Sequence, residues 1–185
     1  DSKIVITTEM ESKGYIDLTL SALRDFGIEI INNDYKEFII KGNQEYKARN
    51  YRVEGDYSQA AFFLVANAIG NKVEIDDVLA KEAIDILSRM GMTVQWNKSK
   101  NGIIPAENND LKATIIDGSQ CPDIIPVLSV AAALAKGTTK IIKAGRLRIK
   151  ECDRLKAVAS ELAKLGAKIE EKEDSLIIEG EESLK

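Results

Sequence analysis

Two short stretches of the chain combine acidic and basic side chains where chemistry could take place. Pro122-Asp123 precedes a long apolar segment, and Lys150-Glu151-Cys152-Asp153-Arg154 lies between a predicted strand and a predicted amphipathic helix. A lysine and an arginine beside backbone N–H groups at a helix start can bind an anion. Acids at both places are also expected for helix capping, because the positive end of the helix dipole favours them. The second stretch therefore predicts an anionic-ligand site, with capping as the alternative.

A cationic stretch surrounds this second block in a mildly acidic protein. The chain has 26 Lys and Arg against 30 Asp and Glu, a net charge of −4, which argues against a nucleic-acid partner. The cations of the stretch are Lys143, Arg146, Arg148, Lys150 and Arg154. Such a run usually forms a solvated face. Its position beside a loop between a strand and a helix favours a binding role here.

Histidine is absent from the 185 residues. Ser-His-Asp triads, Cys-His dyads and histidine metal centres are thereby excluded, so the chemistry must use carboxylates, Lys, Arg, Tyr or Ser. The two cysteines, Cys121 and Cys152, cannot form a disulfide framework or a tetrahedral metal site alone, and they fit a reducing cytoplasm. No apolar run approaches the roughly 20 residues of a bilayer span. We expect a cytoplasmic protein with neither a metal site nor a membrane partner.

A third stretch, Ser12-Lys13-Gly14-Tyr15, leads into the first predicted amphipathic helix. Ser12 can cap that helix, and Tyr15 can pack against the core. The residues alone therefore give only a weak indication of a binding role.

An internal repeat positions these stretches. Three apolar residues and a glycine recur at offsets 0, 3, 6 and 7, which is typical of one helix face followed by a C-terminal cap. The three copies are Leu20, Leu23, Phe26 and Gly27; Ile84, Leu87, Met90 and Gly91; and Ala159, Leu162, Leu165 and Gly166. Each copy is therefore expected to contain the same helix and the same turn after it.

A hairpin of two short strands is predicted after each of these glycines. The predicted strand pairs are 28–32 with 37–41, 92–96 with 102–106, and 167–171 with 175–179. Single strands are predicted at 3–7, 51–54, 72–75, 112–116 and 138–144.

Two further predicted helices, 58–69 and 123–135, are apolar almost all round and should be buried on every side. The first copy lacks such a helix. The repeat predicts an α/β protein with layered sheets and internal pseudo-symmetry. A Rossmann domain is the alternative, but no G-x-G-x-x-G or P-loop follows any predicted strand.

Four blocks of the sequence resemble one known family, the 5-enolpyruvylshikimate-3-phosphate synthases. The blocks are Val53-Glu54-Gly55-Asp56-Tyr57-Ser58-Gln59-Ala60, Pro122-Asp123, Ala135-Lys136-Gly137-Thr138-Thr139 and Lys150-Glu151-Cys152-Asp153-Arg154-Leu155. Their order and spacing extend the resemblance over essentially the whole chain, and the last block is the most specific. The resemblance implies two domains, each of three βαβαββ units around a pseudo-threefold axis, with the site in the cleft between them.

The resemblance also implies that the chain is the middle of a longer enzyme. Residues 1–52 would end the N-terminal domain, and residues 53–185 would be two repeat units of the second domain. An N-terminal phosphate-binding segment, a serine-serine-glutamine loop and a C-terminal aspartate-histidine-arginine motif would lie outside it. We therefore expect the isolated chain to be inactive and to self-associate through exposed apolar surface, whereas the longer enzyme is expected to be a monomer.

The family's reaction transfers an enolpyruvyl group from phosphoenolpyruvate to the 5-hydroxyl of shikimate 3-phosphate. It proceeds through a tetrahedral intermediate with loss of phosphate, and it uses no metal or other cofactor. By matching positions, the resemblance implies that Asp123 accepts the hydroxyl proton. Glu151 would protonate the methylene carbon and later take that proton back, so that both residues act as general acids or bases.

The resemblance assigns substrate-binding roles to four more residues. Arg154 would bind phosphoenolpyruvate, because its bidentate geometry suits the anion better than a lysine does. Lys150 would contact substrate near Asp123. Ser12 would contact the phosphate of shikimate 3-phosphate, and Tyr15 would contact its ring.

The sequence departs from the family pattern at two positions and leaves two rival functions open. Arg146 stands where some members have an asparagine, and Cys152 replaces the usual Ser or Thr. The related transferase that acts on UDP-N-acetylglucosamine shares the fold and chemistry, but its catalytic cysteine loop would lie outside this segment, so Cys121 and Cys152 do not support that function. A non-catalytic α/β repeat module that binds anions is the rival from another functional class.

Overall fold

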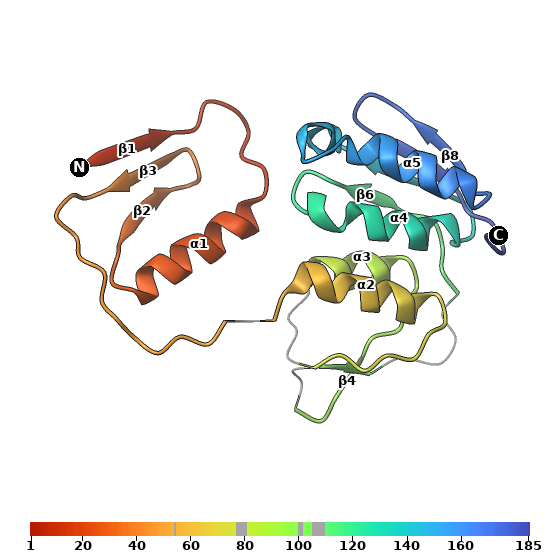
Figure 1. The fold of residues 1–185 in the computed structure, drawn as a ribbon, viewed down its shortest axis with the longest axis horizontal. Coiled ribbons are helices and arrows are strands. Elements are labelled where there is room, and N and C mark those ends of the chain that lie inside the picture. The colour runs from red at the N-terminus through yellow and green to blue at the C-terminus, as the bar shows by residue number, and fades with distance from the viewer. Residues whose placement is uncertain (54, 77–80, 100–101, 105–109) are drawn as a thin grey trace. The chain divides into compact units, whose positions relative to one another are not determined.

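The computed structural model describes residues 1–53, 55–76, 81–99, 102–104 and 110–185 (Figure 1). The chain divides into two compact units, Asp1–Val53 and Glu54–Lys185. The assignment of residues 1–52 and 53–185 to two domains of a longer enzyme stays a prediction.

The first unit is one helix and a three-stranded antiparallel sheet. Its elements are β1 (Ser2–Val5), α1 (Lys13–Asp25), β2 (Ile30–Asn33) and β3 (Glu37–Ile40), and the strand order is β1-β3-β2. The β2–β3 hairpin turns through Asp34 and Tyr35, both of which have positive φ. The N–H of Lys36 donates to the carbonyl of Asn33 across this turn, at 3.0 Å. A tight turn of this kind matches the twist of the two strands.

The second unit contains a four-stranded sheet in the order β6-β7-β9-β8. Its strands are β6 (Ile115–Asp117), β7 (Thr138–Ile142), β8 (Lys168–Glu171) and β9 (Leu176–Glu179). β6 and β7 are parallel, whereas β9 is antiparallel to both β7 and β8. The parallel pair needs a crossover, which η1 (Pro122–Ile124) and α4 (Ile125–Ala133) provide.

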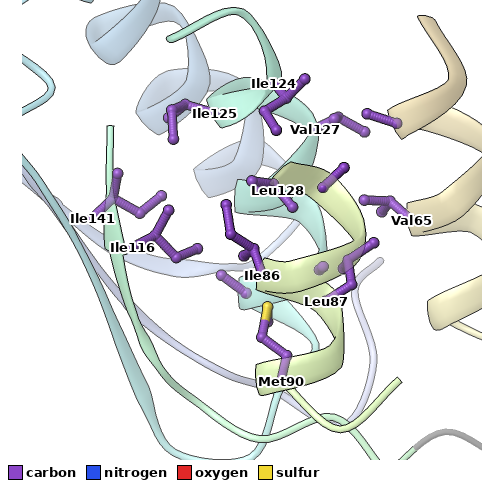
Figure 2. Packing of buried hydrophobic residues seen from close by; sticks show 14 of the residues in the cluster. Val65, Ile86, Leu87, Met90, Ile116, Ile124, Ile125, Val127, Leu128 and Ile141 are labelled. Carbon is purple, nitrogen blue, oxygen red and sulfur yellow. The ribbon is translucent and has the colours of Figure 1, made fainter. Parts of the chain in front are cut away.

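The remaining elements of this unit are α2, α3, α5, η2 and a small sheet. Their bounds are α2 (Tyr57–Ala68), α3 (Lys81–Arg89), β4 (Gln95–Trp96), β5 (Ile103–Ile104), η2 (Gly145–Ile149) and α5 (Arg154–Lys164). The helices and the sheet share one apolar cluster, in which Ile86 and Leu87 of α3, Leu128 of α4 and Ile116 and Ile141 of the sheet are buried (Figure 2).

The repeated helix caps are confirmed at all three glycines. Gly27, Gly91 and Gly166 have φ of 86°, 102° and 93°, and each follows the end of its helix by two residues. In each copy the N–H of the residue after the glycine donates to a carbonyl five residues earlier: Ile28 to Leu23 at 2.9 Å, Met92 to Leu87 at 2.8 Å, and Ala167 to Leu162 at 3.0 Å. This is the Schellman arrangement, in which glycine accepts a left-handed backbone without a Cβ clash.

The α/β repeat architecture is confirmed as well. β6, α4, β7, α5, β8 and β9 form one complete βαβαββ unit. β7 precedes α5 in the chain, and β8 and β9 follow it; these strands lie in the sheet in the order β7-β9-β8. The strands before and after α1 lie in the corresponding order, β1-β3-β2. The first copy shows only the later half of the unit, as predicted.

Several predicted elements need correction. Residues 51–53 form no strand, and residues 72–75 form only an isolated bridge, from Ile75 to Ile103. The predicted strand 112–116 begins as a strand only at Ile115. Residues 54, 105 and 106 of the predicted strands lie outside the described residues.

Burial on every side holds for one apolar helix and fails for the other. α4 buries seven of its nine residues. On α2, however, Phe62 and Phe63 are 52% and 51% exposed. α2 packs against α3 and α4, and these contacts leave about half of each phenylalanine side chain exposed.

Candidate functional site

The loop between η2 and α5 holds the charged block that the sequence singled out. Asp153 is the N-cap of α5, where its Oδ1 accepts a hydrogen bond from the N–H of Lys156 at 3.0 Å. This bond and Arg148 hold the pKa of Asp153 below its ordinary value. The capping alternative is therefore correct for Asp153. It does not explain Glu151, whose side-chain partner is Arg154.

Asp123 reaches the same place from η1. Pro122 occupies the first turn of this short helix, where its missing N–H costs nothing. The Asp123 Oδ1 atom lies 2.9 Å from Arg154 Nη1 and 3.4 Å from Lys150 Nζ. The fold thus brings together residues that are 31 positions apart in the sequence.

Arg154 joins the two carboxylates. Its Nε and Nη2 donate to the two oxygens of Glu151 at 2.8 and 2.9 Å, while its Nη1 donates to Asp123. The side chains of Arg154, Lys150 and Asp123 are 21%, 26% and 28% exposed, whereas that of Glu151 is 65% exposed. In this cluster of Asp123, Lys150, Glu151 and Arg154, Glu151 is the member most open to solvent.

The charges of the cluster determine what it can do. The hydrogen bonds from Arg154 lower the pKa of Glu151, and the same bonds raise the pKa of Arg154. Glu151 is therefore a carboxylate at neutral pH in this arrangement. An anionic ligand that bound Arg154 would compete with Glu151 for the same N–H groups. The cluster can therefore bind an anion and move protons through its carboxylates.

Ser12 and Tyr15 belong to the first unit. Ser12 is at the N-cap position of α1, but its φ is 56° and its side chain makes no capping hydrogen bond. The backbone carbonyl of Tyr15 accepts the hydroxyl of Thr19 at 3.0 Å. A left-handed serine costs free energy, and such residues are often found at functional positions. The proposed roles of Ser12 and Tyr15 stay predictions.

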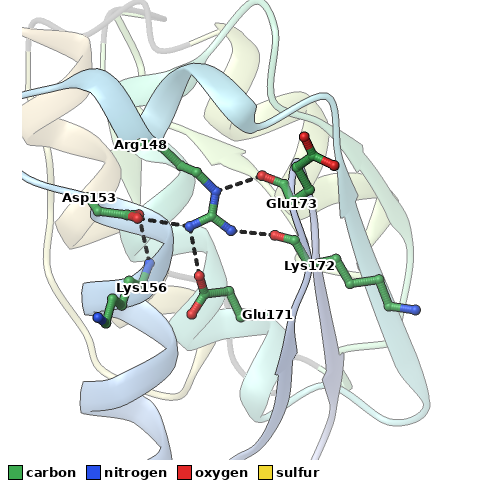
Figure 3. Close-up of polar contacts among 6 residues, drawn as sticks. All are labelled: Arg148, Asp153, Lys156, Glu171, Lys172 and Glu173. Atoms are coloured by element: carbon green, nitrogen blue, oxygen red, sulfur yellow. Dashed lines mark hydrogen bonds and ion pairs between the residues drawn. The ribbon is translucent and has the colours of Figure 1, made fainter.

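The cationic stretch is not a uniform solvated face, because several of its members have fixed partners. Lys143 Nζ lies 3.0 Å from Asp117 Oδ2. Arg148 makes a dense set of bonds with Asp153, Glu171 and the backbone beyond it (Figure 3). No local signal in the sequence indicates this role of Arg148, because its partners on the β8–β9 hairpin lie 23 to 25 residues away.

The two cysteines lie in different surroundings, Cys121 buried and Cys152 exposed. Burial raises the pKa of the Cys121 thiol to about 12, so it is not a nucleophile at neutral pH. Cys152 is exposed, and both thiols are free. Among the described residues, no three His, Cys, Asp or Glu side chains are grouped as metal ligands. None of the helices in these parts of the chain has the length and apolar character of a membrane span.

Comparison with known proteins gives consistent matches over the whole chain. A sequence model of the family described as EPSP synthase (3-phosphoshikimate 1-carboxyvinyltransferase) matches residues 1–185. The chain is 66% identical over 191 residues to the 3-phosphoshikimate 1-carboxyvinyltransferase of Clostridium beijerinckii, an alignment that covers 100% of this chain and 43% of the relative. It is 65% identical over 186 residues to that of Clostridioides difficile, covering 97% of this chain and 42% of the relative. The chain thus spans less than half the length of these curated relatives.

Solved structures agree with this result. An EPSP synthase from Acinetobacter baumannii, 28% identical, superposes with a TM-score of 0.74 over 99% of this chain and 43% of its own. The enolpyruvyl transferase NikO from Streptomyces tendae, 19% identical, superposes with a TM-score of 0.68 over 92% of this chain and 41% of its own. At that identity the second match is evidence for the fold alone.

Proposed function

Since the chain belongs to the EPSP synthase (3-phosphoshikimate 1-carboxyvinyltransferase) family, we propose that it takes part in the transfer of an enolpyruvyl group from phosphoenolpyruvate to the 5-hydroxyl of shikimate 3-phosphate. Phosphate is released, and the product belongs to the shikimate pathway of aromatic amino-acid biosynthesis. The observation that carries the proposal is the convergence of Asp123 and Glu151 on Arg154.

The proposed chemistry divides between the two carboxylates. Asp123 accepts the proton of the 5-hydroxyl while the hydroxyl oxygen attacks the enol carbon of phosphoenolpyruvate. Glu151 gives a proton to the methylene carbon, which becomes a methyl group in the tetrahedral intermediate. The phosphate then leaves with the proton held by Asp123, Glu151 takes a proton back from the methyl group, and the double bond forms again. General acid–base steps of this kind need proton-transferring groups beside the reacting atoms, and carboxylates can fill that role.

The cations hold the anionic substrate. Arg154 offers a planar fork to the carboxylate or phosphate of phosphoenolpyruvate, and Lys150 adds a second positive charge beside Asp123. Substrate that binds Arg154 takes the place of Glu151. Glu151 then loses the partner that lowers its pKa, so substrate binding itself prepares Glu151 to carry a proton. Ser12 and Tyr15 are proposed to contact shikimate 3-phosphate.

A chimera tests these roles. Residues 1–185 replace the matching segment of the Clostridium beijerinckii relative, which is 66% identical, and phosphate release from phosphoenolpyruvate and shikimate 3-phosphate is measured. Asp123→Ala and Glu151→Ala should each lower turnover about 10²- to 10⁴-fold, the range for loss of a general acid or base. Their thermal unfolding midpoints should stay close to that of the parent chimera.

Glu161→Ala is the matched control. Glu161 is an exposed acid that pairs with Lys164 at the same i,i+3 spacing as Glu151 and Arg154, so its loss should leave turnover unchanged. Parent rates in Asp123→Ala or Glu151→Ala would mean that the replaced carboxylate serves only its ion pair with Arg154 and not the reaction.

Family membership bears on one rival function, and the chimera bears on the other. Family membership favours the shikimate reaction over transfer to UDP-N-acetylglucosamine. A chimera that binds phosphate without turnover would support a non-catalytic anion-binding module. We propose a cytoplasmic location as well, which the two free thiols support.

A further inference from the structure

Arg148 connects three parts of the second unit. It lies in η2, and its guanidinium faces the start of α5 on one side and the β8–β9 hairpin on the other (Figure 3). Its Nε donates to the carbonyl of Glu173 at 2.6 Å, and its Nη2 donates to the carbonyl of Lys172. Its Nη1 donates to Glu171 Oε1 at 2.7 Å and to Asp153 Oδ2 at 2.8 Å.

The two oxygens of Asp153 have different partners. Oδ1 caps α5 through the N–H of Lys156, and Oδ2 binds Arg148. The side chains of Asp153 and Arg148 are 34% and 25% exposed, so neither is a freely solvated surface charge. Arg148 therefore fixes the orientation of the capping carboxylate, and the cap in turn fixes the backbone at the first residue of the helix. That first residue is Arg154.

We propose that Arg148 is a positioning residue for Arg154, holding the start of α5 through Asp153 so that the Arg154 guanidinium lies between Asp123 and Glu151. The proposal rests on the function proposed above for those residues. Arg148 acts through Asp153, because its partners are Asp153 and the hairpin and not the two candidate catalytic carboxylates.

The chemistry of the contact explains why an arginine stands here. Two backbone carbonyls and two carboxylates surround the guanidinium in different directions. A planar fork with five N–H donors serves all four acceptors at once, whereas a lysine ammonium has three donors at a single point. Arg148→Lys should therefore keep only some of the hydrogen bonds that Arg148→Met loses.

Amide hydrogen exchange on the 185-residue chain tests the positioning directly, without any substrate. In Arg148→Met, the Lys156 amide that donates to Asp153 should exchange about tenfold faster, as expected when the local opening free energy falls by about 1.4 kcal/mol. The Ala167 amide, which donates to Leu162 at the far end of α5, serves as the internal reference. Arg148→Lys should give an intermediate result.

Arg89→Met is the control variant. Arg89 also bridges a carboxylate, of Asp85, and a backbone carbonyl, of Ile115, but at a different place in the unit. Arg89→Met should leave the exchange rate of the Lys156 amide unchanged. Equal acceleration of Lys156 and Ala167 in Arg148→Met, or no acceleration of either, would overturn the proposal.

Kinetics of the chimera provide the second measurement. Arg148→Met should lower kcat/KM for phosphoenolpyruvate about 10- to 100-fold, mainly through KM, because a small displacement of Arg154 weakens a contact to substrate. The KM for shikimate 3-phosphate should stay the same. A fall in kcat alone, with both KM values unchanged, would mean that Arg148 only maintains the folded fraction. If the parent chimera has no activity, the proposed function fails, and hydrogen exchange still decides the positioning role.

Discussion

Arg154 is the residue on which both candidate catalytic carboxylates converge. Its guanidinium binds both oxygens of Glu151 and one oxygen of Asp123. At the residue scale the site is thus a set of ion pairs whose charges balance among its four members. The carboxylate that lies mostly in water, Glu151, can leave the set at the lowest cost.

The effect of Arg154 on Glu151 can be measured as a change in the pKa of Glu151. In Arg154→Met the pKa of Glu151 should rise toward its ordinary value, because the hydrogen bonds from Arg154 are the main cause that lowers it. NMR of the side-chain carboxyl carbon measures this shift. The pKa of Glu37, which Lys3 and Asn33 lower in the first unit, should not change. An unchanged Glu151 titration would contradict the ion pairing seen in the structure.

The same pair makes stability depend on pH in one direction. The pKa of Glu151 is lower in the folded protein than in the unfolded chain, so the pair contributes stability at pH values above the unfolded pKa. That contribution is lost as the pH falls through the folded pKa. The difference in free energy of unfolding between the unmodified chain and Arg154→Met should therefore be smaller in acid than at neutral pH.

At the scale of elements, the glycine caps repeat in sequence but differ in their surroundings. Gly70 after α2 and Gly91 after α3 have similar φ, 108° and 102°. A Cβ on Gly70 would meet no atom within 4 Å, whereas a Cβ on Gly91 would lie 2.8 Å from the carbonyl oxygen of Asp110. The two caps thus share the same backbone strain and differ in steric room.

This pair separates backbone strain from steric clash. Gly70→Ala should lower the free energy of unfolding by about 1 kcal/mol, the cost of a left-handed alanine. Gly91→Ala should lower it by a further amount of about 1–3 kcal/mol, because the backbone must move to admit the methyl group. Urea denaturation of both variants measures the difference. Equal losses would show that the chain around Asp110 shifts without cost.

Sequence predicts elements of this kind well, because their signals are local. The caps at Gly27, Gly91 and Gly166 follow from spacing alone. The exposed face of α2 does not, since its apolar composition resembles that of the buried α4. Whether an apolar helix is covered depends on its neighbours in space, which the composition of the helix does not contain.

At the scale of the whole molecule, the chain spans less than half the length of its curated relatives. We expect the 185-residue chain alone to release no phosphate from phosphoenolpyruvate and shikimate 3-phosphate, because sites built from many residues lose activity steeply when parts are missing. A coupled phosphate assay of the chain and of the chimera, side by side, checks this. Turnover by the chain alone would contradict it. Self-association also stays a prediction, and the half-exposed Phe62 and Phe63 support it.

The repeat, the helix caps, the family resemblance and the charged residues of the candidate site could all be predicted from the amino-acid sequence. These depend on residue type and on spacings within a few turns of chain, which periodicity and short motifs report directly. The sequence does not predict that Asp123 and Glu151 share Arg154, or that Arg148 ties the Asp153 cap to a distant hairpin. Such contacts join residues up to 31 positions apart. They depend on how α4, α5 and the sheet pack together, because packing places the charged atoms within hydrogen-bonding distance.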